Sequence, residues 1–217
     1  MPWINLDHLS TNVPLPEGYC YEQLTRADIP DVVRSFADWY PGIAVGNASC
    51  HLKESFYDDK VALGGELERD FFVVLFKKER ELVGVLSVER DRDSEVLYGR
   101  VGVVSPKHRG LNLSERFPAL IETMGHAMGM GMVYGLATLQ VPYMQAKFER
   151  LGWQLIGIIP GFDKEMVGPG VVKRVYEAIY TKVLVAEQEF VRPRYANMTA
   201  KTTEFFELLY PGKATAA

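Results

Sequence analysis

The clearest pattern in the sequence is a series of three apolar segments separated by charged turns. Residues 71–76 and 82–88 are rich in β-branched and aromatic side chains, and the charged stretch 77–81 joins them. A second charged stretch, 89–95, leads into a third apolar run at 96–104. Apolar runs of this length between polar turns are typical of paired strands. The pattern therefore predicts a three-stranded antiparallel meander.

After the meander, the spacing of apolar positions becomes that of a helix. Between residues 113 and 132, apolar side chains recur every three or four positions, which predicts one buried helical face. Pro118 lies within this stretch and has no amide to donate. We expect it to kink the helix or to mark the point where its regular part begins.

The other patterns predict the remaining elements and the fold class. In chain order they are an irregular arm at 1–17, a strand at 19–24, a helix that starts at Thr25 or Asp28 and ends before Pro41, a helix at 48–61, a strand at 133–139, a short helix at 142–151, strands at 152–158 and 171–185 with a Gly/Pro-rich loop between them, and a helical patch at 203–209. This order combines a meander with two strand–helix–strand units. It predicts an α/β fold of the mixed, α+β type.

Composition and charge exclude several classes of protein. The 217 residues are 47% hydrophobic and 24% charged, with a net charge of −4. This is ordinary for a globular chain and argues against broad nucleic-acid binding. The most apolar long stretch, 113–139, contains charged residues, and the first residues lack a signal-peptide pattern, so we expect a cytoplasmic protein without a membrane partner. The two cysteines, Cys20 and Cys50, form no metal-binding spacing, and no metal is expected.

One segment between a predicted strand and a predicted helix carries the chemistry. Residues 103–114 read Val-Val-Ser-Pro-Lys-His-Arg-Gly-Leu-Asn-Leu-Ser. The first amides of the following helix have no partner within it, and together with the helix dipole they favour an anion such as phosphate. Gly110 lets the backbone approach a ligand, and Asn112 can adopt the left-handed conformation or cap the helix. The structural alternative is a plain strand-to-helix turn with a solvated basic cluster.

In this context the chain resembles the GCN5-related N-acetyltransferase superfamily. The family's signature, Val-x-Pro-x-x-Arg-Gly-x-Gly-x-Gly/Ala, is similar to residues 104–114, and its Tyr-x-x-x-Gly-Phe pattern is similar to residues 148–153. The resemblance covers residues 18–186 in matching element order. It leaves an N-terminal arm at 1–17 and an extension at 187–217.

The resemblance implies a mixed seven-stranded sheet flanked by helices and an acetyl-CoA or other acyl-CoA cosubstrate. Strands 96–104 and 133–139 would splay apart, with the thioester between them. The backbone of Gly102, Val103 and Val104 would pair with the pantetheine arm. The amides of Arg109, Gly110, Leu111, Asn112, Leu113 and Ser114 would bind the pyrophosphate.

The implied reaction is the transfer of an acyl group to an amine acceptor, either a small molecule or a protein amine. The family commonly has a general-acid tyrosine where Phe148 stands here. Tyr98 and Tyr143 are the remaining candidates for that role. Tyr98 is expected on the same side of its strand as Arg100 and Gly102. The alternative for both tyrosines is ordinary packing.

Further departures from the family concern binding and the general base. Asn112 and Ser114 stand where the family often has glycine, and Val141 replaces a common asparagine. The position of a frequent glutamate falls on Tyr98 or Arg100, which leaves Glu89 as a water-mediated base or as a solvated carboxylate in a turn.

Three other features of the sequence bear on function. His108 would serve as a cation on the phosphate side of the loop. Next to Cys50, His51 suggests a thiol nucleophile, but no third orienting group is apparent, so a buried thiol beside a surface imidazole is the favoured interpretation. Residues 39–42 fall in the region that lines the acceptor pocket in the resembled family. Their aromatic side chains would hold an amine or an apolar acceptor, and the alternative is ordinary packing of a helix end.

Two other functions remain open. One is a non-catalytic acyl-CoA-binding or sensing module on the same fold, and the other is an interaction protein whose basic loop meets a protein carboxylate. The apolar patch 203–209 needs a partner surface, either the core or a second subunit. A homodimer is therefore one option for the assembly.

Overall fold

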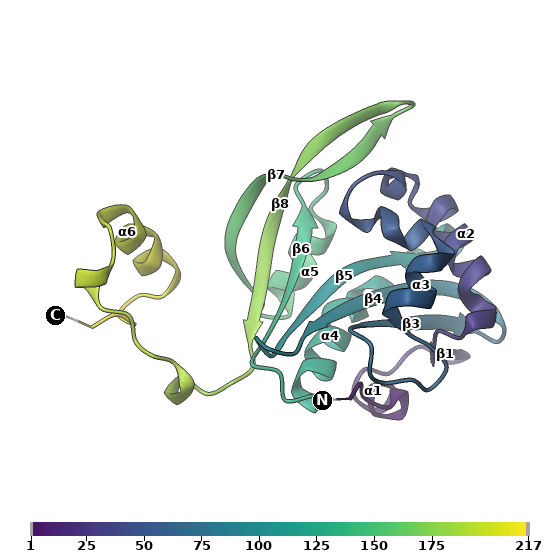
Figure 1. Cartoon of the computed structure of the whole chain (residues 1–217), viewed down its shortest axis with the longest axis horizontal. Coiled ribbons are helices and arrows are strands. Elements are labelled where there is room, and N and C mark those ends of the chain that lie inside the picture. The colour runs from purple at the N-terminus through teal and green to yellow at the C-terminus, as the bar shows by residue number, and fades with distance from the viewer. Residues whose placement is uncertain (1, 216–217) are drawn as a thin grey trace. The chain divides into compact units, whose positions relative to one another are not determined.

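The computed structural model describes residues 2–215 and divides the chain into two compact units (Figure 1). The first unit extends to Leu184, and the second begins at Val185. In the described part of the chain, no helix is both long enough and apolar enough to cross a membrane.

The first unit is built on one mixed β-sheet whose strands lie in the order β1-β3-β4-β5-β6-β8-β7. The strands are β1 (Tyr19–Gln23), β3 (Phe71–Lys78), β4 (Glu81–Asp91), β5 (Val96–Val104), β6 (Met132–Thr138), β7 (Gln154–Gly168) and β8 (Val171–Val183). Neighbours on this path are antiparallel except for β5 and β6, and the two-residue β2 (Val61–Ala62) pairs with β3 in parallel. The predicted fold class, a mixed seven-stranded sheet with flanking helices, is confirmed, and β2 adds a short eighth strand.

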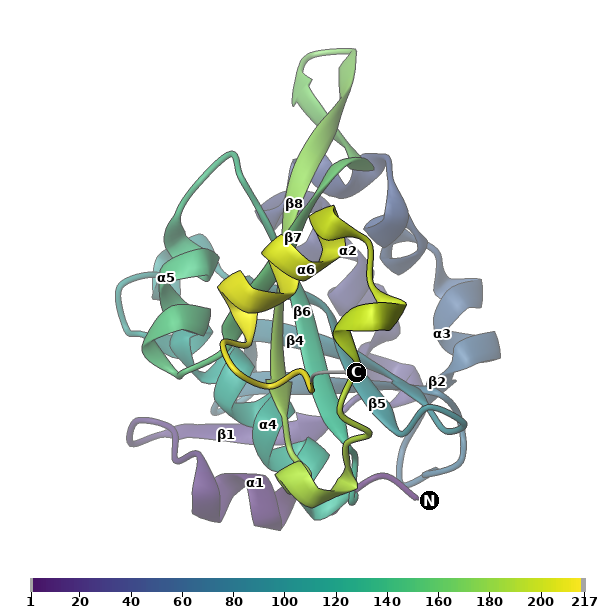
Figure 2. The ribbon, with the colours of Figure 1, turned by 90° about the vertical axis from the view of Figure 1, so that its left-hand side faces the viewer.

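Helices cover both faces of this sheet, and each face has its own apolar core. One core contains side chains from α2 (Ile29–Trp39) and α3 (Glu54–Lys60). The other contains side chains from α1 (Leu6–Asn12), α4 (Arg116–Ala127) and α5 (Tyr143–Arg150). Figure 2 shows α3 and α5 on opposite sides of the sheet. Burial of apolar side chains on both faces is what holds the central strands in place.

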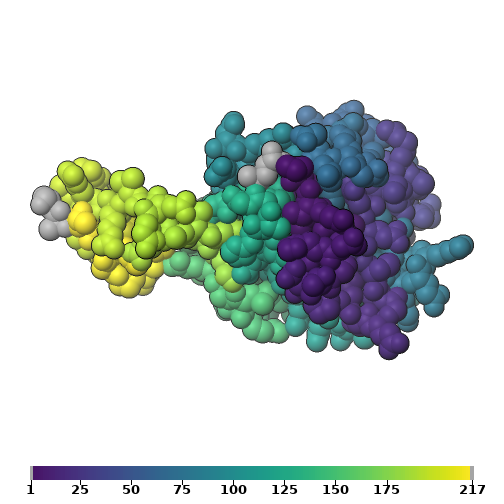
Figure 3. Space-filling view, turned by 90° about the horizontal axis from the view of Figure 1, so that it is seen from below, coloured from purple at the N-terminus to yellow at the C-terminus, as the bar shows by residue number. Residues whose placement is uncertain are grey.

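The prediction that residues 1–17 form an irregular arm is wrong. Residues 6–12 form α1, and Asn5 caps its first turn by accepting a hydrogen bond from the amide of Asp7. Leu9 is fully buried, and Trp3 is buried with its indole N–H donating to the carbonyl of Arg69 at 2.6 Å. In Figure 3 these N-terminal residues, in dark purple, lie against the surface of α4, in teal. Three prolines obscured a helix that is only two turns long.

Two further elements differ from the sequence-based expectation. The predicted helix 48–61 is a 3-10 turn at Asn47–Leu52 followed by the shorter α3. The predicted Gly/Pro-rich loop after residue 158 is instead strand, because β7 continues to Gly168 and pairs along β8. The register shifts between Ile159 and Asp163, and this irregularity accommodates Pro160 and Gly161 without ending the strand.

Pro118 marks the start of the regular helix, as one of the two expected outcomes. The helix α4 begins at Arg116, so Pro118 lies in its first turn, where amides have no acceptor within the helix.

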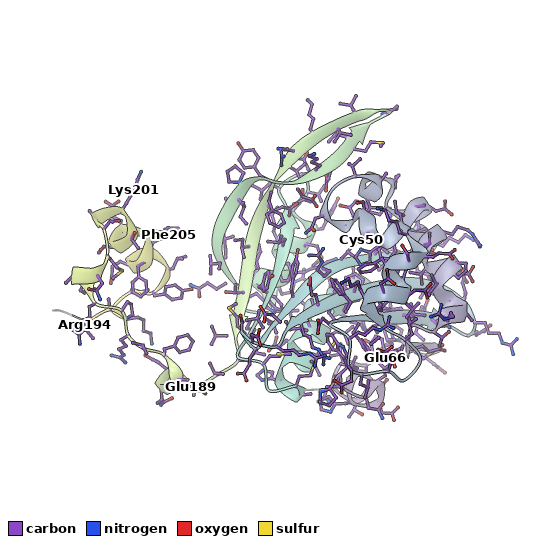
Figure 4. All side chains as sticks on the ribbon, in the orientation of Figure 1. Cys50, Glu66, Glu189, Arg194, Lys201 and Phe205 are labelled. Atoms are coloured by element: carbon purple, nitrogen blue, oxygen red, sulfur yellow. The ribbon has the colours of Figure 1, made fainter. Side chains whose placement is uncertain are left out.

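The second unit contains 3-10 turns at Glu187–Glu189 and Tyr195–Asn197 and the helix α6 (Ala200–Leu209). The predicted helical patch at 203–209 is therefore helical. Figure 4 labels Lys201 and Phe205 on α6. No residue of α6 is buried, and the side chains of Phe205 and Leu208 are exposed.

Candidate functional site

The parallel strands β5 and β6 separate halfway along their length. They pair only from Val96 with Met132 to Gly99 with Gly135, and Figure 1 shows them diverging beyond that point. At the same place the register between β4 and β5 shifts, because Gly99 and Val101 face consecutive residues of β4 and Arg100 is the extra residue. A bulge increases the local twist of a strand. The backbone of residues 100–104 therefore pairs with β4 on one side, and no strand among residues 2–215 pairs with its other side.

The bulge also changes which side chains share a face of β5. The guanidinium carbon of Arg100 lies 5.0 Å from the centre of the Tyr98 ring, so these two side chains are on one face as predicted. Gly102 is on the other face, because a β-carbon there would stand 2.4 Å from the ring of Phe117 on α4. The prediction that Gly102 faces the same side as Tyr98 is wrong, because simple alternation fails across a bulge.

The loop after β5 presents a row of backbone amides to solvent. Gly110 has a φ of +89° and Asn112 a φ of +56°, so Asn112 adopts the left-handed conformation and does not cap the helix with its side chain. Within residues 2–215, no acceptor is found for the amides of residues 110–114. These amides precede α4, whose dipole adds positive potential at the same point. They border a cavity of about 170 Å³.

A lysine that the sequence analysis did not single out lines this cavity. The ammonium of Lys147 on α5 donates a hydrogen bond to Oγ of Ser114 at 2.5 Å. Burial lowers the pKa of Lys147, and the neighbouring Glu115 opposes that effect. Glu115 is itself paired with Arg150 at 2.9 Å. No spacing rule links residue 147 to residue 114, so the sequence alone carried no signal for this contact.

The three basic residues of the loop have different surroundings. Arg109 borders the cavity and donates to the carbonyl of Trp39, at the end of α2, at 3.2 Å. Lys107 is exposed. His108 is buried, and its Nδ1 lies 3.0 Å from the Tyr19 hydroxyl while its Nε2 lies 3.8 Å from Glu81. His108 also lines the cavity, and both of its ring nitrogens face protein groups. Its role as a cation on the phosphate side of the loop stays a prediction.

The two tyrosines predicted as candidate catalytic residues lie in very different environments. Tyr98 is buried at the point where β5 and β6 part, and its ring stacks on Tyr134 at 4.4 Å. Burial raises its pKa. Tyr143 is the first residue of α5, and its side chain is 69% exposed. Only Tyr98 is held next to the splayed strands.

Phe148 packs at the same point from the opposite face of the sheet. A β-carbon at Gly135, the last residue of β6 that pairs with β5, would stand 2.6 Å from the far end of the Phe148 ring. The ring stacks on Tyr180, whose hydroxyl donates to Glu149 at 2.7 Å. A tyrosine at position 148 would place its hydroxyl near the point where β5 and β6 separate. Phenylalanine provides no proton donor there.

Carboxylates from the long hairpin gather near Tyr98, and the sequence did not show that they converge. On β7, Glu165 accepts a hydrogen bond from the hydroxyl of Tyr40 at 3.0 Å, and Asp163 accepts one from the amide of Asn47 at 2.7 Å. On β8, Glu177 is buried. Burial, together with the charges of Glu165 and Asp163, raises the pKa of Glu177 to about 7. Tyr40 belongs to the segment that was predicted to line an acceptor pocket.

Two other polar features have structural explanations. His51 is fully buried and Cys50 is partly exposed, which is the reverse of the expected arrangement. Burial raises the pKa of Cys50 and lowers that of His51 to about 4, so this pair does not favour a thiolate. Glu89 lies within β4 and not in a turn, and it pairs with Arg100 at 3.4 Å. Among residues 2–215, no three His, Cys, Asp or Glu side chains converge to hold a metal ion.

Comparison with solved structures agrees with this architecture. The spermidine/spermine N-acetyltransferase SpeG from Vibrio cholerae superposes with a TM-score of 0.61 at 10% identity, over 77% of this chain and 95% of that one. The structure of yncA, a putative acetyltransferase from Salmonella typhimurium with its cofactor acetyl-CoA, superposes with a TM-score of 0.55 at 14% identity, over 78% of this chain and 95% of that one. A putative phosphinothricin N-acetyltransferase superposes with a TM-score of 0.59 at 13% identity, over 77% of this chain and 99% of that one. No protein-family model matches the sequence, and no curated protein matches it.

The chain has the fold of the GCN5-related N-acetyltransferases. The resemblance predicted from residues 104–114 and 148–153 is thereby confirmed at the level of the fold. The splayed strands and the amide-lined loop lie where that resemblance implies an acyl-CoA site.

Proposed function

We propose that the protein transfers an acyl group from acyl-CoA to an amine. The observation that carries this proposal is the continuity of β5 with the loop that follows it. The strand has a free edge over residues 100–104, and the next segment presents the unpaired amides of residues 110–114 at the start of α4. A chain-like ligand with a pyrophosphate at one end matches both features.

The residues present fit such a ligand. The amides of Gly110 to Ser114 would bind the pyrophosphate, with Lys147 and Arg109 adding positive charge at the rim of the cavity. The backbone of Gly102, Val103 and Val104 would pair with the pantetheine arm as a further strand, and the thioester would then lie near Gly99 and Gly135. Pairing of a ligand with a free strand edge uses the same hydrogen bonds as a sheet.

In the proposed reaction, the amine nitrogen bonds to the thioester carbonyl carbon and the carbon–sulfur bond breaks. The amine loses one proton and the sulfur gains one, so the products are an amide and the free thiol of CoA. A free strand amide close to the thioester, at residues 100–101, would stabilise the developing oxyanion. Tyr98 is the better placed of the two candidate acids, because Tyr143 is exposed and Phe148 has no proton to give.

The second candidate is a non-catalytic acyl-CoA-binding module on the same fold. It is favoured by Phe148 at the usual tyrosine position and by the high pKa of Tyr98, which makes that phenol a weak acid. Both candidates predict binding of CoA, and only the first predicts turnover.

A thiol-release assay separates these two functions. Acetyl-CoA is mixed with the protein and with a panel of mono- and diamines, and free CoA thiol is measured against a blank without amine. We expect amine-dependent release that falls at least tenfold in Tyr98→Phe, because general acid catalysis contributes about 10²–10⁴-fold. If CoA binds but no amine gives turnover, the protein is the binding module.

A further inference from the structure

Glu177 is a largely buried residue whose carboxylate has no partner among residues 2–215 and is still reached by solvent. The residue is only 7% exposed, and no described residue donates a hydrogen bond to it or forms an ion pair with it. A buried charge without a partner is costly to the folded protein. A ligand that supplies a positive charge would offset this cost. Binding of such a ligand explains why the protein has an unpaired carboxylate at this position.

The neighbours of Glu177 add negative charge and leave it unneutralised. Both Glu165 and Asp163 are close enough to raise its pKa, and their own hydrogen bonds to Tyr40 and to the amide of Asn47 hold them in place. Lys173 stands opposite Glu165 in the hairpin register, yet it is exposed and forms no ion pair within residues 2–215. The cluster is therefore two anchored carboxylates and one free one.

The cluster faces the proposed acyl site. Glu177 pairs with Thr138 on β6, which shares a face of that strand with Tyr134, the residue that stacks on Tyr98. The charge of Glu177 also contributes to raising the pKa of both Tyr98 and Tyr40. These contacts place the carboxylates on the same side of the sheet as Tyr98, where β5 and β6 part.

We propose that Glu177, together with Glu165 and Asp163, binds an amine acceptor that carries a second positive charge, such as a diamine or polyamine. This inference rests on the proposed function, because only an acyltransferase has an amine acceptor. One ammonium group of the ligand pairs with Glu177 in the buried site, where a charge-assisted hydrogen bond is strong. The other amine, uncharged at the moment of attack, reaches the thioester between the splayed strands.

Isothermal titration at pH 8 tests this inference with 1,4-diaminobutane and n-butylamine as the two probes, without CoA. The wild-type protein should bind the diamine about tenfold more tightly than the monoamine, because at pH 8 and without CoA the diamine carries two ammonium groups that can pair with the three carboxylates, whereas the monoamine carries one. Glu177→Gln keeps the shape of the side chain and should abolish the preference. Asp59→Asn, at an exposed carboxylate on α3, should leave it unchanged.

Equal affinity for the two probes would overturn the inference, and so would a preference that survives in Glu177→Gln. Glu165→Gln gives a second reading, because its amide oxygen can still accept from Tyr40 while its charge is lost, and it should weaken diamine binding. A parallel titration with CoA keeps the two ideas apart. If CoA binds without any diamine preference, this inference fails while the CoA site, and with it the acyltransferase proposal, is not contradicted. If the diamine binds and CoA does not, the cation site stands and the acyltransferase proposal fails.

Discussion

At the residue scale, two side chains that approach the site from distant parts of the chain decide its electrostatics. Lys147 places a positive charge beside Ser114 at the amide loop, and Glu177 places a negative charge beside Tyr98. The two charges lie where the proposed reaction needs opposite properties. One would attract the pyrophosphate, and the other would attract the amine.

Glu177→Gln should change how stability depends on pH. The raised pKa of Glu177, about 7 against its usual 4.5, means that the folded protein holds this proton longer than the unfolded chain does. The wild-type free energy of unfolding should therefore fall as the pH rises from 4.5 to 7, and glutamine should avoid this loss. We expect Glu177→Gln to be more stable by about 3 kcal/mol at pH 8, with a smaller gain at pH 5.5.

Urea unfolding at the two pH values measures this difference. The charged or titratable groups near Glu177 are Asp163 and Glu165 on β7, Tyr98 on β5 and Tyr40 after α2. The tyrosines have raised pKa values and stay neutral in this pH range. The change in unfolding free energy with pH therefore reports the titration of the carboxylates. A gain that is the same at both pH values would contradict a titration of Glu177.

Lys147→Met should weaken CoA binding by about tenfold, because it removes one charge at the amide loop and the hydrogen bond to Ser114. The loss should shrink at high salt, since screening already weakens the charge. Lys60→Met is the matched control, at an exposed lysine in the last turn of α3. Equal CoA affinity in Lys147→Met and Lys60→Met would remove Lys147 from the site.

These residues also show the limits of reading a site from sequence. The roles of Gly110 and Asn112 could be predicted because they depend on local conformation, namely a backbone with positive φ before a helix. Lys147 and Glu177 could not be predicted, since each reaches the site from an element that meets the loop or the splay only in the folded protein. Tertiary contact, and not spacing, selects them.

At the element scale, the turn between β5 and α4 forms the proposed phosphate site. Gly110 has a φ of +89° with open space around its α-carbon, so only the backbone conformation, and not a neighbouring atom, requires glycine there. Gly157 on β7 also has open space and has no positive φ. This pair of glycines separates conformational strain from steric crowding.

Gly110→Ala should destabilise the protein by about 1–2 kcal/mol, because an L-residue in the left-handed region is strained. Gly157→Ala should be neutral or slightly stabilising, because alanine loses less conformational freedom on folding than glycine does. Thermal unfolding of both variants measures the difference. Equal melting temperatures for the two variants would contradict the strained turn.

The elements themselves could mostly be predicted, because period-two and helical patterns extend over many residues. The meander, α4 and β6 follow directly from such patterns. The irregular features could not be predicted in this way. The bulge at Arg100 reverses the faces of β5, and the register shifts let β7 continue through Pro160 and Gly161, where local sequence indicated a loop.

At the scale of the whole molecule, the chain combines an acetyltransferase-like unit with a second unit beyond Val185. A unit as short as the second has too few residues for a core of its own, and α6 carries exposed apolar side chains such as Leu208. That these side chains pack on another protein surface, on the same chain or in a homodimer, stays a prediction.

We expect the first unit to bind CoA through the amide loop and the splayed strands. Thermal unfolding with and without millimolar CoA tests it most directly, because a ligand that binds only the folded state raises the melting temperature by mass action. We expect a clear rise with CoA, a smaller rise in Lys147→Met and the wild-type rise in Lys60→Met. A melting temperature that millimolar CoA leaves unchanged would contradict the account.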